Sequence, residues 1–352
     1  MRKRVHPGGA DLPTSISIKD IARSAKVSHS TVSRALNNSP RVKSETVERI
    51  RRIAEQSGYR GSAIARSLAT RRSMTIGVVV TTIADLFAAG VVSGIETVAG
   101  DHGYSVFLAN SNADPDREMR VVRTFEERRV DGIIVMASRV GALHIPLLSR
   151  MNVPIVPLNN QHPSEFAHSV MIENFSASYE AAKYLVELGH RRIAYIGDRN
   201  GRQSDTERFG GYRQALDAGN LPFQPELVLY GTATPESAME AVANFLNLPE
   251  PPTAVFCYDD MTALGAMRQI HAAGLRVPED ISVIGFDDLS IVQFTDPPLT
   301  TVRQPMQEMG RLAMETMLDL LGGSGATHKI KVRGELIVRG STGPPKAAVA
   351  RT

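Results

Sequence analysis

The sequence of 352 residues predicts a small all-α unit followed by a larger α/β unit. Between Ile18 and Asn37, apolar residues recur at helical spacing in two short runs. From Met74 onward, short apolar strands alternate with amphipathic helical segments, which indicates doubly wound parallel sheets. The charge changes at the same place. Residues 1–72 hold 16 Lys and Arg against 5 Asp and Glu, which leaves 24 against 32 for the rest.

The stretch IKDIARSAKVSHSTVSRALN, residues 18–37, predicts two helices joined by a tight turn. One face of each helix is apolar, so the two can close a small core. These faces are formed by Ile18, Ile21, Ala22 and Ala25 on the first helix and Val27, Thr31, Val32, Ala35 and Leu36 on the second. Ser28 stands at the N-cap of the second helix, where its hydroxyl can accept a hydrogen bond from a free amide.

The outward face of the second helix is typical of a helix-turn-helix unit, whose second helix enters the DNA major groove. A surface helical hairpin is the alternative interpretation. A third helix, which Ser44 can cap and Gly58 can end, and the surplus of positive charge both favour DNA binding. The DNA-binding residues that we expect in this unit are Ser28, His29, Ser30, Thr31, Arg34, Asn37 and Arg41.

Three motifs in this order carry a specific resemblance: TVSRALN, the pair Gly58–Tyr59, and ARSLA at residues 65–69. From about Ser17 to Gly340 the sequence resembles the lactose-repressor and galactose-repressor family of bacterial transcription regulators. The resemblance implies a helix-turn-helix headpiece and a two-lobed domain like the periplasmic binding proteins. It also implies a repressor that binds a pseudo-palindromic operator. A homodimer is expected rather than a tetramer, because the C-terminus carries no leucine heptads.

The resemblance also assigns roles to the turn and the linker. Lys26 occupies the turn position where the family usually has glycine, and a positive φ there would cost lysine about 1 kcal/mol. The family uses the linker as a hinge that becomes helical on operator DNA. Leu68 would then be an apolar wedge in the minor groove. Packing of Leu68 against the next domain is the alternative.

Two series of strands and helices follow Met74 and predict two lobes. The expected strands include MTIGVVVT, YSVFLAN, DGIIVMA and VPIVPL in the first series, and RRIAYIG, ELVLYG, TAVFCYD and ISVIGFD in the second. The expected helices are 87–100, 116–129, 143–151, 174–188, 206–218, 235–248, 262–273 and 305–321. Strands at 330–332 and 335–338 should return the chain to the first lobe and then to the second.

These patterns divide the chain into five parts. They are an arm at 1–15, the headpiece at 16–62, a hinge at 63–73, a ligand-binding and dimerisation domain at 74–340, and a tail at 341–352. Within the large domain, lobe 1 should comprise about 74–172 and 304–328, and lobe 2 about 173–301 and 329–340. The arm lacks periodicity and should be flexible, and the tail, which is rich in Pro and Ala, should be disordered.

Polar residues follow the predicted strands, where parallel sheets bind ligands. The residues that we expect to contact an effector are Asp85, Phe87, Asn159, Asn160, Arg202, Arg208, Asp259, Asp287 and Gln304. Carboxylates, amides, arginine and one aromatic ring suit a small sugar or sugar derivative. By resemblance, ERFGGY, YDDMTALGAM and GFDD place Arg208, Asp259 and Asp287 at ligand positions. DLFA at 85–88 matches the usual NPFF loop only in part, and Asn159–Asn160 replace the commoner Asp-Arg pair, so a purine or nucleoside effector remains the alternative.

Several classes of protein are disfavoured. Neither GxGxxG nor GxSxG follows a suitable strand, so we expect no enzyme activity and no cofactor. Cys257 is the only cysteine, and the nine histidines show no metal-ligand spacing, so we expect no metal site. The N-terminus lacks the apolar region of a secretory signal, and no apolar run could span a bilayer. A cytoplasmic protein is expected, in which ligand either relieves or enhances DNA binding.

Overall fold

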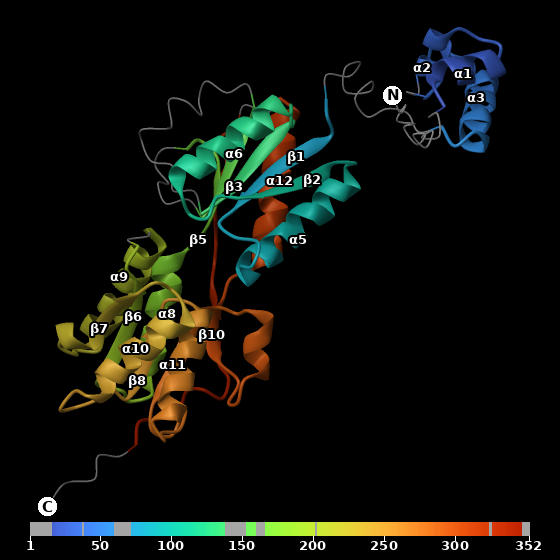
Figure 1. The fold of residues 1–352 in the computed structure, drawn as a ribbon. Helices are drawn as coiled ribbons and strands as arrows, with labels where there is room; N and C mark the ends of the chain where they lie inside the picture. The colour runs from blue at the N-terminus through green and yellow to red at the C-terminus, as the bar shows by residue number, and fades with distance from the viewer. Residues whose placement is uncertain are drawn as a thin grey trace, which may run out of the picture. The chain divides into compact units, whose positions relative to one another are not determined.

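The computed structural model describes residues 16–36, 39–59, 72–137, 153–159, 166–200, 203–323 and 326–346. The predicted arm, the residues Asn37, Leu68, Asn160 and Arg202, the helix at 143–151 and the last six residues lie outside these ranges. The chain divides into two units, Met1–Ser73 and Met74–Thr352 (Figure 1).

The described part of unit 1 contains three helices, α1 (Ile18–Ser24), α2 (His29–Leu36) and α3 (Ser44–Gln56). Their apolar faces close one core, as predicted. Its buried members are Ile21, Ala22, Ala25, Val32, Ala35, Ile50 and Ala54. The Ser17 hydroxyl and backbone both bond to Asp20, which forms a capping box at the start of α1.

The ends of α3 confirm one expectation and correct another. Gly58 follows the C-cap with a φ of +67°, which glycine adopts without a Cβ clash. The prediction that Ser44 caps α3 is wrong, because Ser44 is already the first residue of the helix. Lys43 is the N-cap, in an extended conformation with no side-chain cap bond.

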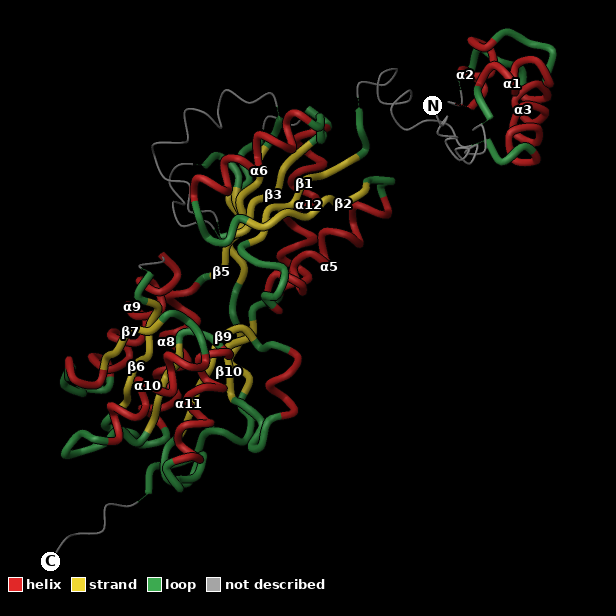
Figure 2. Tube along the Cα trace, viewed as in Figure 1, coloured by secondary structure: helices red, strands yellow, loops and turns green. Residues whose placement is uncertain are grey.

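Unit 2 contains two six-stranded sheets, one in each lobe (Figure 2). The sheet of lobe 1 has the order β11-β5-β4-β3-β1-β2. Its strands are β1 (Thr75–Val80), β2 (Ser105–Asn110), β3 (Gly132–Met136), β4 (Ile155–Leu158), β5 (Ser169–Ile172) and β11 (Lys329–Val332). Helices α5 (Leu86–Asp101) and α12 (Met306–Leu321) share a core with one face of this sheet, and α6 (Pro115–Glu127) packs on the other.

The sheet of lobe 2 has the order β12-β10-β9-β8-β6-β7. Its strands are β6 (Ile193–Asp198), β7 (Val228–Gly231), β8 (Ala254–Cys257), β9 (Ser282–Asp287), β10 (Thr300–Arg303) and β12 (Glu335–Ile337). Helices α10 (Pro235–Leu246) and α11 (Asp260–Ala272) cover one face, and α8 (Asn174–Glu187) and α9 (Gln203–Ala218) cover the other. Two short 3₁₀ helices, η1 (Pro225–Leu227) and η2 (Ser290–Phe294), complete the lobe.

The chain passes between the lobes three times, after β5, after β10 and after β11. The predicted return of the last strands is confirmed, since β11 joins lobe 1 and β12 joins lobe 2. Residues 329–332 therefore belong to lobe 1, whereas the predicted boundaries placed 329–340 in lobe 2. The predicted tail also begins too early, because Ser341 is buried in lobe 2 and its hydroxyl donates to the Val283 carbonyl. Three other details differ from the sequence interpretation. Strand β5 was not predicted, β12 runs antiparallel to β10, and β2 is an edge strand with Phe107 and Leu108 each 48% exposed rather than buried.

Candidate DNA-binding and effector sites

The start of helix α2 is organised by Ser28. The Ser28 Oγ accepts a hydrogen bond from the Thr31 backbone N at 3.1 Å, which is the predicted N-cap. The same oxygen lies 2.8 Å from both the Ser30 and Thr31 hydroxyls. Buried Val32 and Ala35 fix the inner face of the helix, so that His29 and Arg34 are exposed on the other side. The exposed side of α2 therefore offers an imidazole, a guanidinium and hydroxyls to a groove of DNA.

The turn before α2 carries the strain that the sequence predicted. Lys26 has a φ of +53°, in the left-handed region where a Cβ is unfavourable. Arg41, beyond α2, is exposed, and its backbone N donates to the Ser39 Oγ at 3.4 Å. Exposed cations on both sides of the helix suit contacts with phosphates.

A cleft between the two lobes of unit 2 brings together seven of the nine predicted effector residues. They are Asp85, Phe87, Asn159, Arg208, Asp259, Asp287 and Gln304. The cleft is also lined by five residues that were not singled out, Thr81, Met136, Ala137, Ser204 and Tyr258. Thr81, Ala137 and Tyr258 directly follow β1, β3 and β8. The sequence analysis placed all three inside the predicted strands, so the rule of strand ends passed over them. Ser204 lies on α9, and that rule gives no signal for it.

Arg208 is held by lobe 2 and is only 4% exposed. Its Nε donates to the Asn174 Oδ1 at 2.9 Å, and another guanidinium nitrogen donates to the Tyr258 carbonyl at 2.5 Å. The guanidinium carbon lies 3.6 Å from the centre of the Phe286 ring, which adds a cation–π contact. Arg208 therefore both faces the cleft and braces β8 against α8 and α9.

Asp287 ends β9 and is 9% exposed, with an unusual φ of +125°. The Gln304 Nε2 donates to its Oδ1 at 2.5 Å, and Arg208 lies 4.0 Å away. Burial raises the pKa of Asp287 well above its usual value, although Arg208 acts in the opposite direction. A separation of 4.0 Å is too long for a hydrogen bond, so the arginine does not offset the loss of solvation. The carboxyl group of Asp287 therefore stays protonated to a higher pH than that of an exposed aspartate.

A chain of polar contacts links the lobes through Gln304. Asn159, at the end of β4 in lobe 1, accepts from the Ile172 backbone N at 3.2 Å. Its Nδ2 points to the Gln304 Oε1 at 3.5 Å, and Gln304 then bonds to Asp287 in lobe 2. Because Gln304 lies in the segment that crosses between the lobes, a change in their orientation must alter these contacts.

Two other carboxylates in the cleft also cap helices. The Asp85 Oδ1 accepts from the Phe87 backbone N at 3.0 Å, and the Asp259 Oδ1 accepts from the Thr262 backbone N at 2.7 Å. Capping fixes the orientation of each carboxylate at the edge of the cleft. The ring of Phe87 packs against the apolar clusters of both lobes, so it lies at their contact.

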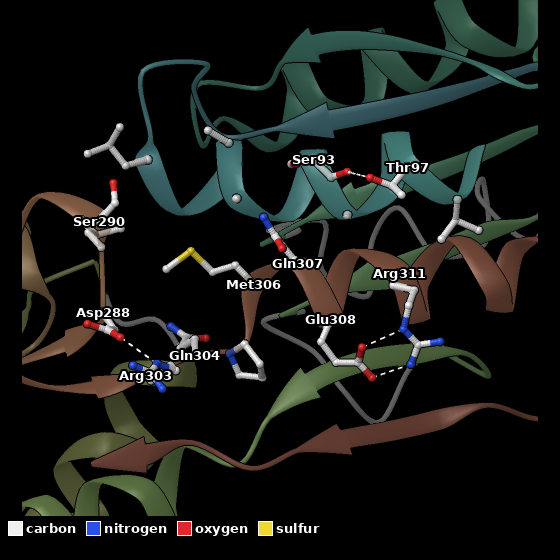
Figure 3. A pocket seen from close by; sticks show the side chains of 17 residues that line it. Ser93, Thr97, Asp288, Ser290, Arg303, Gln304, Met306, Gln307, Glu308 and Arg311 are labelled. Atoms are coloured by element: carbon white, nitrogen blue, oxygen red, sulfur yellow. Dashed lines mark hydrogen bonds and ion pairs between the residues drawn. The ribbon is translucent and has the colours of Figure 1, made fainter. Parts of the chain in front are cut away.

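A larger groove lies beside this cleft and shares Gln304 with it (Figure 3). The groove has a volume of about 820 Å³, whereas the cleft has about 100 Å³. The charges in the groove are paired with one another, Arg303 with Asp288 at 2.7 Å and Arg311 with Glu308 at 2.5 Å. The smaller cleft is the candidate effector site, because the carboxyl ends of strands from both sheets meet there.

The fold and the two sites define a class of protein. A basic three-helix unit with an exposed recognition helix, followed by two α/β lobes around a polar cleft, is the architecture of a ligand-controlled DNA-binding regulator. Within the described residues, no helix is both long enough and apolar enough to cross a membrane. The same part of the chain contains no group of three or more His, Cys, Asp or Glu arranged to hold a metal ion.

Comparisons with known proteins agree with this class. The profile of bacterial regulatory proteins of the lacI family matches residues 17–62, and that of a periplasmic binding protein-like domain matches residues 182–342. The chain is 37% identical to the HTH-type transcriptional repressor CytR of Escherichia coli (strain K12) over 331 residues, which cover 94% of this chain and 97% of CytR. It is 35% identical to the repressor PurR of Vibrio atlanticus (strain LGP32), over 86% of this chain and 91% of PurR.

Solved structures show the same relationship. The lac repressor dimer bound to operator and the anti-inducer ONPF superposes with a TM-score of 0.86 at 27% identity, covering 94% of this chain and 100% of that one. The complex of the transcriptional regulator CelR with cellobiose gives a TM-score of 0.71 at 31% identity, covering 93% and 99%. The chain therefore belongs to the lacI family of bacterial regulatory proteins. It is a DNA-binding transcriptional regulator and not an enzyme.

Proposed function

We propose that the protein is a repressor whose affinity for operator DNA is set by a small sugar or sugar derivative bound between the lobes. The observation that carries this proposal is the cleft itself, in which three carboxylates, two amides and one arginine converge from both lobes. Planar polar groups of this kind bind the paired hydroxyls of a sugar, and the Phe87 ring can cover an apolar sugar face. The cellobiose complex of the related CelR supports the same ligand class.

The small volume of the cleft and its lining by both lobes explain how a ligand could control DNA binding. A volume of about 100 Å³ is well below the roughly 300–1,000 Å³ of typical ligand pockets. A sugar therefore requires a different spacing of the lobes. A ligand changes DNA affinity only through its differential affinity for two such arrangements, and couplings of this kind are about 1–3 kcal/mol.

A purine or nucleoside is the second candidate effector. The rings of Phe87 and Tyr258 both line the cleft, and either could stack on a planar base. Asp259 and Asn159 could then accept from and donate to the base edge. The likeness to the repressor PurR is consistent with this candidate.

On the DNA side, we propose a homodimer in the cytoplasm that binds a pseudo-palindromic operator. The lac repressor structure, a dimer on its operator, supports this arrangement. Half-sites should then lie about one helical turn apart. We assign base contacts to His29, Ser30 and Arg34, phosphate contacts to Asn37, Arg41 and the amides near Ser28, and the minor-groove wedge to Leu68.

Arg34→Ala tests the DNA contacts. We expect a loss of about 1–3 kcal/mol in operator binding and a relaxed preference at one base pair of each half-site. Arg52→Ala, which removes the same charge from an exposed position on α3, is the matched control and should weaken binding evenly across sequences. A selection from randomised operators measures the base preference of both variants. An unchanged preference profile for Arg34→Ala would remove this residue from the base-reading set.

The effector is tested by thermal stability and then by operator affinity. A panel of sugars and nucleosides is added to the full-length protein, since a ligand at 100 times its Kd adds about 2.7 kcal/mol of stability. Operator affinity is then measured with and without each ligand that stabilises the parent. Asp287→Asn should abolish the response, and Asp217→Asn, on the exposed side of α9, should retain it. Weaker operator binding with ligand indicates induction, and stronger binding indicates co-repression. If Asp287→Asn responds like the parent, the effector does not bind in this cleft.

A further inference from the structure

Asp260 is a buried acid that lies behind the effector cleft and does not line it. It is the first residue of α11 and is completely inaccessible to solvent. Both of its carboxylate oxygens accept hydrogen bonds. The Leu289 backbone N donates to Oδ2 at 2.8 Å, and the Thr301 Oγ1 donates to Oδ1 at 2.5 Å.

These two donors belong to the segments that carry the cleft residues of lobe 2. Leu289 directly follows Asp287 and Asp288, which both have positive φ values, +125° and +60°. Thr301 lies on β10, three residues before Gln304. The Asp260 carboxylate therefore ties the strained turn after β9 to the strand that leads into the crossover.

The Asp260 carboxylate is packed closely against strand β9. Gly285 on β9 lies directly beneath it, and a Cβ at this position would lie 2.3 Å from the Asp260 Oδ1. Thr301 pairs with Gly285 across β9 and β10, so the acid, the glycine and the threonine form one packed contact. The absence of a side chain at Gly285 therefore allows the Asp260 carboxylate to approach both strands.

We infer that Asp260 is a positioning residue of the effector cleft, whose carboxylate fixes the Asp287–Asp288 turn and strand β10 so that Asp287 and Gln304 meet. This inference rests on the proposed function, because it concerns the same cleft. A purely apolar core residue could fill the space but could not accept from Leu289 and Thr301 together.

The charge on Asp260 also reaches Asp287. The pKa of Asp260 is raised to about 7, mainly by burial and to a smaller extent by Asp259 and Asp288, while the hydrogen bonds from Thr301 and Leu289 act in the opposite direction. Asp260 in turn raises the pKa of Asp287, while Arg208 lowers it. Arg303 and Arg339 face the turn from β10 and from beyond β12, and both pair with Asp288. The titration of Asp287 should therefore depend on the charge of Asp260.

Carboxyl titration by NMR tests the coupling in the full-length protein without any ligand. Aspartate is labelled with ¹³C at Cγ, and the Asp287 signal is assigned by its loss in Asp287→Asn. In Asp260→Asn, which keeps the shape of the side chain, the midpoint of the Asp287 titration should move to lower pH. A residue that served only to fill space would leave the midpoint where it is, and that result would overturn the inference.

Hydrogen exchange tests the positioning. Thr301→Val removes one donor to Asp260 and keeps the shape of the side chain, so the peptide that contains Leu289 should exchange about tenfold faster. Thr262→Val is the matched control, because the Thr262 Oγ1 on the same helix as Asp260 is buried without a hydrogen-bond partner. Thr301→Ser, which restores the hydroxyl, should exchange like the parent. Equal exchange rates of the Leu289 peptide in Thr301→Val and Thr262→Val would show that Asp260 does not hold the turn and strand β10 together. Neither measurement uses an effector, so failure here is separate from failure of the proposed function.

Discussion

Replacement of Gly94 by alanine should destabilise lobe 1 although alanine is the better helix former. Gly94 lies where α5 crosses α12, and a Cβ there would lie 2.0 Å from the backbone O of Gln307. Gly310 makes the reciprocal contact, since its Cβ would lie 2.0 Å from the backbone O of Val91. Backbone atoms cannot rotate away as a flexible side chain can, so the two helices must move apart.

The size of the effect follows from these distances. Ordinary van der Waals contact begins near 3.4 Å, so the helices must separate by 3.4 minus 2.0, or 1.4 Å, at the crossing. Overpacking of this kind typically costs about 1–3 kcal/mol or more. The helix propensity of alanine returns up to about 1 kcal/mol. Because backbone rather than side-chain atoms must move, we take the upper end of this range, about 3 kcal/mol, and expect a net loss of about 3 minus 1, or about 2 kcal/mol. The same shift would loosen Met309 and Met314, which α12 inserts into the core of lobe 1.

Gly100 supplies the matched control on the same helix. A Cβ at Gly100 would meet nothing within 4 Å, so Gly100→Ala should be neutral or stabilising by up to about 1 kcal/mol. The chain has no tryptophan, so urea unfolding is followed by circular dichroism, with hydrogen exchange of α5 peptides to assign the transition to lobe 1. If Gly94→Ala is as stable as Gly100→Ala, the close approach of the helices does not limit the packing.

Three further predictions concern the headpiece, the cleft and the hinge. Lys26→Gly should stabilise the headpiece by about 1 kcal/mol, because glycine tolerates the positive φ; slower hydrogen exchange in α1 and α2 would show it, and no change would indicate an unstrained turn. Because burial raises the pKa of Asp287, the folded protein keeps a proton that the unfolded chain releases near pH 4. The parent should therefore lose stability relative to Asp287→Asn as the pH rises above about 4, and parallel urea midpoints at pH 4 to 8 would contradict this. Leu68→Ser should reduce operator bending and weaken specific binding more than non-specific binding, while effector binding is unchanged; an equal bend angle in a gel-shift assay would exclude the wedge.

The sequence predicted the class of fold and most elements because hydrophobic periodicity reports which face of an element is buried. It could not distinguish the edge of a sheet from its centre. Strand β2 reads as a continuous apolar run, but its place beside β1 alone leaves Phe107 and Leu108 half exposed. Strand β5 was missed because its apolar run is only three residues, 170–172, and is flanked by the polar residues Ser169 and Glu173.

The cleft was predictable to the extent that it follows strand ends. Asp85 and Asp259 were selected as polar residues in loops, and they prove to be helix caps as well as residues of the cleft. Tyr258 was overlooked because the predicted strand TAVFCYD extended past it, whereas β8 ends at Cys257. The role of Asp260 depends on contacts with β9 and β10, which are far away in the sequence, so no local pattern could reveal it.

The order of synthesis has a consequence for lobe 1, because its sheet is completed by segments from the end of the chain. Strands β1 to β5 end at Ile172, but α12, which covers one face of them, ends at Leu321, 149 residues later. At about 5–20 residues per second, the ribosome needs on the order of ten seconds or more to make that interval. During this time most of lobe 2 is made, although its strand β12 follows Leu321, while Ile134 and Val156 in lobe 1 still lack the methionines of α12 that pack in the same core. The nascent protein therefore exposes part of an apolar sheet face in lobe 1 until Leu321 has left the ribosome, and we expect chaperones to bind this face during synthesis.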